Sequence, residues 1–475
     1  MARKSIQQFQ GEMPMLTAWQ GFTLQTLPLA RWQAGSLAYR LIGLWGNWRA
    51  GSWLLQWAEP LGVLLIALVL GFAPFFDTGL IGVLLIATGA YWLLLTLTDD
   101  QRQSVTPIHW GLLLYFAMMV LSTAFSPEKK LALTGLIRFS LYLGFFLLAA
   151  QVLRSPRWRN WLLTSYLHLA LVVTVYGLRQ QIHGVDQLAT WNDPTSPLAN
   201  ATRVYSYLGN PNVLSSYLLP AITLSIAALL LWQGWLPKLL AGMMVVLNTA
   251  CLYFTGSRGG WLGLMVALVV LFLLARYWYA AALPQFWRRW LLPLVFGSFG
   301  AAVLGAILTV EAVRLRVMSI FAGRGDSSNN YRINVWESVF KMIGDFPILG
   351  IGPGNGVFKK VYPLYARTGF ENALGAYSVF LEHILEIGWF GFASFLWLLI
   401  LTLSQGLNQL GRLRRLGDDQ GLWLMGAIAG GAALLTQGCF DTVWYRPVIN
   451  TLWWLMVAIV AGFAVPTPEP DPAES

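Results

Sequence analysis

The sequence carries little charge for its length, and this lack excludes most soluble folds. Only 11% of its 475 residues are charged, whereas a soluble domain usually has about 25%. Cysteine and histidine are also scarce, with two and four residues. Cys251 and Cys439 lie in or at the end of apolar segments, so we expect free thiols rather than a disulfide framework. There is no metal-spaced His and Cys cluster, Walker motif or internal repeat, so we predict no metal site and no cofactor.

Apolar residues dominate instead, at 57% of the chain, and the mean hydropathy is +0.59. The 24 tryptophans fit a membrane protein, because Trp collects at membrane–water interfaces. The formal net charge is +10, but Lys and Arg in a membrane protein set its orientation, so we expect no nucleic-acid partner. The N-terminus lacks a short apolar core with a small-residue cleavage site, so we expect the first spanning helix to direct insertion.

The apolar runs predict an all-α polytopic membrane protein, with the lipid bilayer as its main partner. A spanning helix needs about 20 mostly apolar residues. About twelve such runs occur, at 60–76, 79–98, 108–125, 131–152, 159–178, 211–232, 236–255, 259–280, 289–310, 376–402, 420–439 and 445–465.

The regions outside these runs divide the chain into three parts. Residues 1–58 form a tail and a Trp- and Arg-rich segment, which we expect to lie on the membrane surface. Residues 59–465 form the transmembrane domain, and the Pro-rich acidic residues 466–475 are predicted to be disordered.

The charge of the short loops predicts that both termini are cytoplasmic. With that orientation most loop Lys and Arg lie inside, as the positive-inside rule requires. The outer short loops then hold only Lys129, Lys130, Arg179, Arg203, Arg258 and Arg446.

A long loop, residues 311–375, is predicted to lie outside the membrane. Ile333, Trp336, Phe340 and Ile343 recur at helical spacing, which predicts an amphipathic helix that lies on the membrane or covers a cavity. We expect Asn329 or Asn330 to cap this helix and Pro347 to follow its end. A favourable pair between Glu337 and Lys341 is expected on its polar face.

Glycines alternate after this helix, over residues 350–356. Such a run is either a plain connecting turn or a source of backbone N–H groups for an anion.

Three arginines on the predicted outer side are candidates for an anion site. Arg203 precedes Asn210, Pro211 and Asn212, where Asn210 is expected to cap the next helix and present its positive N-terminus outward.

Arg258 lies in the short turn before the eighth span, and Arg332 is expected to begin the amphipathic helix of the long loop. The planar guanidinium group suits phosphate or carboxylate. Headgroup anchoring is the alternative role for each arginine.

Ionisable residues inside the predicted spans are a second group of candidates, because such residues are costly in a membrane. Arg138 lies in the fourth span, and Glu382, His383 and Glu386 lie one helical turn apart in the tenth. The second group either relays protons or forms a polar patch against neighbouring helices.

These motifs, in this order, resemble the O-antigen ligase and polymerase-like superfamily of bacterial membrane proteins. The matching elements are residues 203–212, the turn 255–260, the run 332–354 and the large outer loop before a late span. Within the superfamily the chain looks most like the cyanobacterial IctB group, which is named for a proposed role in inorganic carbon accumulation. The resemblance implies a multi-pass protein of the bacterial inner membrane, and it leaves plasma and thylakoid membranes open.

The resemblance also implies a catalytic histidine ahead of a Gly-x-x-Gly motif, and here the chain departs from the family. Gly388 and Gly391 supply the glycines, but Tyr377 stands at the histidine position, with Ser378 after it. Tyrosine is a poor base near neutral pH. Arg203 and Arg258 match the family's arginines near the lipid-pyrophosphate site.

Three functions therefore remain open. The first is accumulation of bicarbonate, a small anion, through an arginine site. The second is glycan transfer from a lipid-linked pyrophosphate donor, with Glu382 as a replacement base. The third is a non-catalytic role beside protein partners that the sequence does not identify.

Overall fold

The structure is a computed structural model, and it describes residues 18–25, 42–98, 105–186, 188 and 201–464. Across these residues the secondary structure is helical and contains no strand. Ten of the helices are long and apolar enough to cross a membrane. The prediction of an all-α polytopic membrane protein is therefore confirmed.

A helix is present at each of the predicted spans. They are α5 (Ala58–Phe72), α6 (Thr78–Thr98), α7 (Pro107–Phe125), α8 (Lys129–Val152), α9 (Pro156–His183), α10 (Pro211–Leu231), α11 (Trp235–Phe254), α12 (Arg258–Tyr279), α13 (Gln285–Thr309), α17 (Val379–Leu416), α18 (Gly421–Gly438) and α19 (Pro447–Gly462). The helices α5 and α19, with 15 and 16 residues, are shorter and are not among these ten helices.

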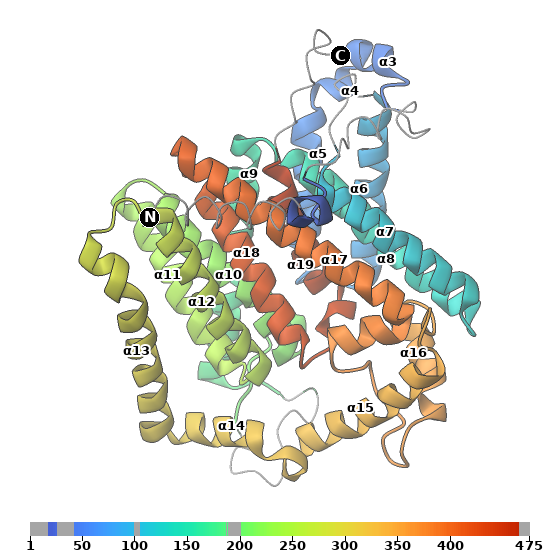
Figure 1. The fold of residues 1–475 in the computed structure, drawn as a ribbon, viewed down its shortest axis with the longest axis vertical. Coiled ribbons are helices and arrows are strands. Elements are labelled where there is room, and N and C mark those ends of the chain that lie inside the picture. The colour runs from blue at the N-terminus through green and yellow to red at the C-terminus, as the bar shows by residue number, and fades with distance from the viewer. Residues whose placement is uncertain (1–17, 26–41, 99–104, 187, 189–200, 465–475) are drawn as a thin grey trace, which may run out of the picture.

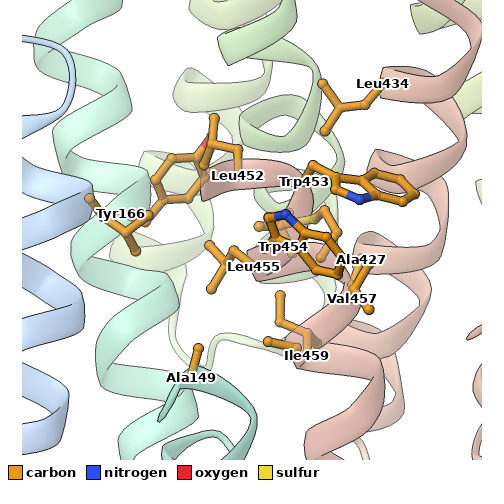
Figure 2. Close-up of a cluster of buried hydrophobic side chains, with 14 of the residues drawn as sticks. Ala149, Tyr166, Ala427, Leu434, Leu452, Trp453, Trp454, Leu455, Val457 and Ile459 are labelled. Atoms are coloured by element: carbon orange, nitrogen blue, oxygen red, sulfur yellow. The ribbon is translucent and has the colours of Figure 1, made fainter. Parts of the chain in front are cut away.

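The centre of the bundle is built from α10, α18 and α19. Side chains of α19 are buried on every side, and its Trp453 and Trp454 lie between α18 and the neighbouring helices (Figure 2). Tyr166 of α9 closes this core, and its hydroxyl donates to the Tyr217 carbonyl of α10 at 3.1 Å. A helix buried all round must be apolar all round, as α19 is.

The helix α13 lies at the edge of the bundle. No residue of its most apolar 18-residue stretch is buried, whereas 83% of the corresponding stretch of α10 is buried. Figure 1 shows α13 standing to one side, with α14 (Glu311–Phe321) and α15 (Ser327–Asp345) crossing one end of the molecule.

The helix α17 is broken near its start. Gly388 has φ +66° and ψ −177°, which separates Val379–Ile387 from the rest of the helix. A Cβ at this position would lie 2.1 Å from the Ile348 carbonyl oxygen, so only glycine fits. The predicted span 376–402 is therefore corrected to a short half-helix followed by a long helix that runs to Leu416.

The long loop contains the expected helix, but its buried face differs from the prediction. The buried stripe of α15 consists of Asn334, Val335, Ser338, Val339, Met342 and Ile343. Phe340 is 59% exposed. The prediction followed only the large apolar residues, whereas tertiary packing also buries small polar side chains along this helix.

The local contacts of α15 also differ from the prediction. Asp326, not Asn329 or Asn330, caps the helix and accepts from the Asn329 N–H at 2.9 Å. Glu337 pairs with Arg324 rather than with Lys341, because the preceding turn brings Arg324 over the first turns of α15. The helix ends at Asp345, before Pro347, as expected.

Two predicted regions are described only in part. The end of the chain, 466–475, lies outside the described residues. In the N-terminal segment, α3 (Gly46–Gly51), α4 (Trp53–Gln56) and the residues beside them expose Trp45, Trp48, Trp53 and Trp57. The prediction that this segment lies on the membrane stays a prediction.

Candidate functional site

A large cavity lies at the end of the bundle that α14 and α15 cross. Its volume is about 790 Å³. The helix starts of α10 and α12, the helix α14, the first turns of α15 and the turn between α18 and α19 form its walls. We call it the main cavity, and its polar lining includes Arg203, Asn212, Arg258, Arg316, Arg332 and Tyr377.

Arg203 is held at the start of α10. Its Nε donates to the Thr255 carbonyl at 2.8 Å and its Nη2 donates to Asn212 Oδ1 at 3.1 Å. Asn210 caps α10 as predicted, because its Oδ1 accepts from the Asn212 N–H at 2.8 Å and from the Val213 N–H at 3.3 Å. The sequence had grouped Arg203, Asn210 and Asn212, and the fold places all three on the main cavity.

Arg258 and Arg316 approach the cavity from α12 and α14. Arg258 forms an ion pair with Asp326 at 3.1 Å and donates to the Ser319 carbonyl at 3.0 Å. Arg316 donates twice to the Gly256 carbonyl, at 3.0 and 2.7 Å. The sequence analysis missed Arg316, because it treated the long loop as a unit and weighed only Arg332 within it.

Arg332 faces Tyr377 across the cavity wall. Its guanidinium carbon lies 5.8 Å from the centre of the Tyr377 ring, and its Nε donates to the Phe440 carbonyl at 3.1 Å. Arg332 was expected to begin α15, but it lies in the second turn of this helix.

Tyr377 itself is conformationally unusual, with φ +51°. Non-glycine residues in this region are uncommon, and they cluster at functional sites. Burial, and then the neighbouring Tyr331, raises the pKa of Tyr377 well above its usual value of about 10. Its hydroxyl is therefore protonated near neutral pH and acts as a hydrogen-bond donor rather than a base.

The main cavity has an excess of positive charge. Four arginines line it, Arg203, Arg258, Arg316 and Arg332, against two aspartates, Asp326 and Asp441. Burial, and then the charges of Arg316, Arg258 and Arg332, lower the pKa of Arg203 to about 9, so its guanidinium remains charged at neutral pH. An anion bound here would relieve this repulsion.

Asp441 is the second residue that the sequence analysis missed. It is 8% exposed, and burial raises the pKa of its carboxyl even though Arg332 and Arg203 oppose that shift. It follows the end of α18, where a lone aspartate beside Arg446 gives no sequence signal of its position in a cavity.

A second, smaller cavity of about 130 Å³ lies on the other side of the α18–α19 turn. We call it the inner cavity, and its lining includes Tyr115, Arg138, Glu382, His383, Glu386 and Trp454. The four intramembrane residues singled out from the sequence thus lie together in this cavity, separate from the arginines of the main cavity. Tyr445 lines both cavities.

The short half-helix of α17 supplies the acidic side chains of the inner cavity. Ser378 caps this half-helix, so it has a structural contact. The Thr442 hydroxyl donates to Glu382 Oε2. His383 bonds to the Val379 carbonyl at 2.7 Å through Nδ1 and stacks on Tyr115, with ring centres 6.0 Å apart. Across the described residues, no three His, Cys, Asp or Glu side chains are grouped as a metal site.

The glycine run 350–356 lies against the break in α17 and forms hydrogen bonds with its carbonyl groups. The N–H groups of Ile351 and Gly352 donate to the carbonyls of Leu385 and Glu386, at 2.8 and 3.0 Å. The Gly354 N–H donates to Glu386 Oε1 at 2.8 Å. Of the two alternatives, the run does offer an N–H to an acidic group, but this group is the protein's own Glu386 side chain.

Part of the chain that forms the main cavity matches a known protein family. Residues 243–396 match the O-antigen ligase family. The match begins in α11 and ends in α17, so it contains Arg258, Arg316, Arg332 and Tyr377 but not Arg203 or Asp441. The match does not confirm the resemblance to the narrower cyanobacterial IctB group. No curated protein matches the chain.

Proposed function

We propose that this O-antigen ligase-like membrane protein binds a polyprenyl-diphosphate-linked glycan and transfers the glycan to a hydroxyl acceptor. The observation that carries the proposal is the convergence of Arg203, Arg258, Arg316 and Arg332 on one cavity. Guanidinium groups bind phosphate oxygens in a bidentate manner, and a diphosphate diester carries one negative charge on each phosphate. These two charges match the excess of arginines over aspartates in the main cavity.

The size of the cavity favours this ligand over bicarbonate. A site for a ligand of drug-like size has a volume of about 300–1,000 Å³, and the main cavity has about 790 Å³. A bicarbonate ion has only four heavy atoms, and a water molecule, with one, occupies about 30 Å³, so bicarbonate would fill a small part of the cavity. Bicarbonate accumulation, the role suggested by the IctB resemblance, uses the same arginines but leaves most of this space unexplained.

The proposed chemistry uses the arginines at the leaving group. An acceptor hydroxyl attacks the anomeric carbon, the bond from that carbon to the phosphate oxygen breaks, and negative charge develops on the diphosphate. Preorganised cationic donors stabilise charge that forms in the transition state. Tyr377, which stands at the family's histidine position, serves as a donor at the cavity wall and not as the base.

The test is binding of a polyprenyl diphosphate to the purified protein in lipid nanodiscs. We expect binding to the wild type and a loss of about 100-fold or more in an Arg203→Gln, Arg258→Gln double variant, because charge-assisted hydrogen bonds contribute about 1.5–3 kcal/mol each. Polyprenyl monophosphate and bicarbonate are the comparison ligands.

Three outcomes decide between the roles. Equal binding by wild type and double variant would refute the arginine site. Bicarbonate uptake by proteoliposomes, lost in the double variant, would favour the carbon-accumulation role. Diphosphate binding without transfer in membranes that hold donor and acceptor would favour the non-catalytic role.

A further inference from the structure

We propose that Glu382, acting through the Thr442 hydroxyl, takes up the proton that the acceptor hydroxyl loses during glycan transfer. This inference rests on the proposed function. It starts from the carboxylates at the main cavity, since Tyr377 is not a base. Two of them, Asp326 and Asp441, line the cavity directly, and Glu382 reaches it through Thr442.

The two aspartates already have other partners. Asp326 is paired with Arg258 at 3.1 Å and also caps α15. Asp441 accepts from the Thr442 N–H at 2.8 Å, and the charges of Arg332 and Arg203 stabilise its ionised form. Protonation of Asp326 would disrupt its ion pair and its cap, so it is a poor proton acceptor. Asp441 is bonded to the Thr442 backbone N–H, whereas the Thr442 hydroxyl donates to Glu382, so a proton passing through this hydroxyl reaches Glu382.

Glu382 differs because it accepts from a hydroxyl group that lines the main cavity and lies in none of the ion pairs among the described residues. It is 8% exposed, and its carboxylate accepts a hydrogen bond from the Thr442 hydroxyl. A buried carboxylate without a cationic partner gains from binding a proton, because burial disfavours the charged form.

The residue next to this pair is Gly375, which has no side chain to obstruct the contact. A Cβ at Gly375 would lie 2.7 Å from Thr442 Oγ1 and 3.1 Å from Glu382 Oε1. Thr442 lines the main cavity and Glu382 lines the inner cavity. The hydroxyl–carboxylate pair therefore connects the two cavities.

The inner cavity supplies the surroundings of the protonated group. The titratable or charged groups that face Glu382 from the elements around it are Tyr115, Arg138, Tyr142, His383, Glu386, Tyr445 and Asp441. Its volume of about 130 Å³ accommodates about four waters at about 30 Å³ each. Waters in a space of this size would give the proton a route away from Glu382 after each turnover.

The step balances in atoms and electrons. The acceptor O–H proton moves to Thr442 Oγ1 while the proton already on Oγ1 moves to Glu382 Oε2. The freed electron pair on the acceptor oxygen forms the bond to the anomeric carbon. The bond from that carbon to the phosphate oxygen breaks, and the diphosphate leaves with that electron pair.

The test compares Glu382→Gln and Thr442→Val with their matched controls, Glu371→Gln and Thr442→Ser. Membrane vesicles from the source organism, with the gene deleted and each variant restored, provide the natural donor and acceptor. The initial transfer rate is measured against pH, and polyprenyl diphosphate binding is measured on the same purified variants.

We expect Glu382→Gln and Thr442→Val to lower the rate about 100-fold or more with unchanged diphosphate binding, since a positioned base contributes about 10²–10⁴-fold. The wild-type rate should fall as the pH falls and the carboxylate is protonated, and Glu382→Gln should lack this fall. Thr442→Ser and Glu371→Gln, the latter at an exposed residue that lines neither cavity, should keep both the rate and the pH profile.

Each contrary result has its own meaning. An unchanged rate and pH profile in Glu382→Gln, with normal transfer by the wild type, would refute the proton route alone. Equal losses in Thr442→Val and Thr442→Ser would also refute it, because the serine keeps the hydroxyl. No transfer by the wild type would refute the proposed function itself.

Discussion

The two cavities adjoin at Tyr445, yet they are opposite in chemistry. The main cavity is large and lined by four arginines, whereas the inner cavity is small, aromatic and carries Glu382 and Glu386. The first is suited to a charged ligand from outside, and in the second a backbone N–H, that of Gly354, already donates to Glu386. A net charge of +10 describes neither, because what matters at each site is which charges the fold brings together.

The largest effect should come from the break in α17, the helix that carries Glu382 and Glu386. Gly388→Ala places a Cβ 2.1 Å from the Ile348 carbonyl oxygen at a residue with φ +66°. We expect a loss of about 3 kcal/mol or more in stability, or failure to fold, because strain and overpacking add. Thermal unfolding in detergent measures this loss.

The control for Gly388 is Gly297→Ala in α13, where a Cβ meets nothing within 4 Å. It should leave the unfolding temperature unchanged. A similar drop in both variants would show that the break in α17 is not specifically constrained.

Charge in the main cavity should produce the next largest effect. Arg316→Gln should weaken polyprenyl diphosphate binding by about tenfold or more, because a charge-assisted donor contributes about 1.5–3 kcal/mol. Arg138→Gln at the inner cavity should leave binding unchanged. Equal losses in the two variants would remove the distinction between the cavities.

A smaller effect should follow loss of the cap at the start of α10. Asn210→Ala removes the acceptor for the N–H groups of Asn212 and Val213, at a cost of about 1 kcal/mol in stability. Asn210→Ser, which can still cap, should retain most of that stability. Unfolding by denaturant detects the difference, and an Asn210→Ala variant as stable as the wild type would contradict the assigned cap.

The smallest effect concerns pH. Burial raises the pKa of Asp441 above its usual value of 3.8. As the pH falls through this raised pKa, the carboxyl becomes neutral, the main cavity gains net positive charge, and diphosphate binding should tighten a few-fold. The same raised pKa means that the ionised Asp441 weakens folding above that pH.

Asp441→Asn is the matched variant for this pH effect. It should bind the diphosphate more tightly at pH 8 and show a smaller change between pH 8 and pH 4 than the wild type. Equal pH dependence in both proteins would exclude Asp441 as the source. Titration of the ligand itself is common to both and cancels in the comparison.

Local sequence determined much of this fold. Each apolar run became a helix, because a run of this length can satisfy its backbone in a membrane only by helix formation. Asn210 and Pro211 mark the start of α10 as local capping rules require. The residues Arg203, Arg258 and Arg332 were also identifiable, since each stands beside a short motif.

Tertiary structure decided how deeply each helix is buried. The helices α10 and α13 have similar hydropathy, 2.0 and 2.2, yet 83% and 0% of their apolar windows are buried. Hydropathy measures preference for lipid or for protein interior alike, so it does not say which of the two surrounds a helix.

Tertiary structure also decided the composition of the site. Arg316 and Asp441 stand in segments with no local motif, and they reach the main cavity only because α14 and the α18–α19 turn cross one end of the bundle. The break at Gly388 requires the chain near Ile348 to pack against it. Capping and helix length depend on neighbours in sequence, whereas a cavity depends on side chains that are distant in sequence and brought together by packing.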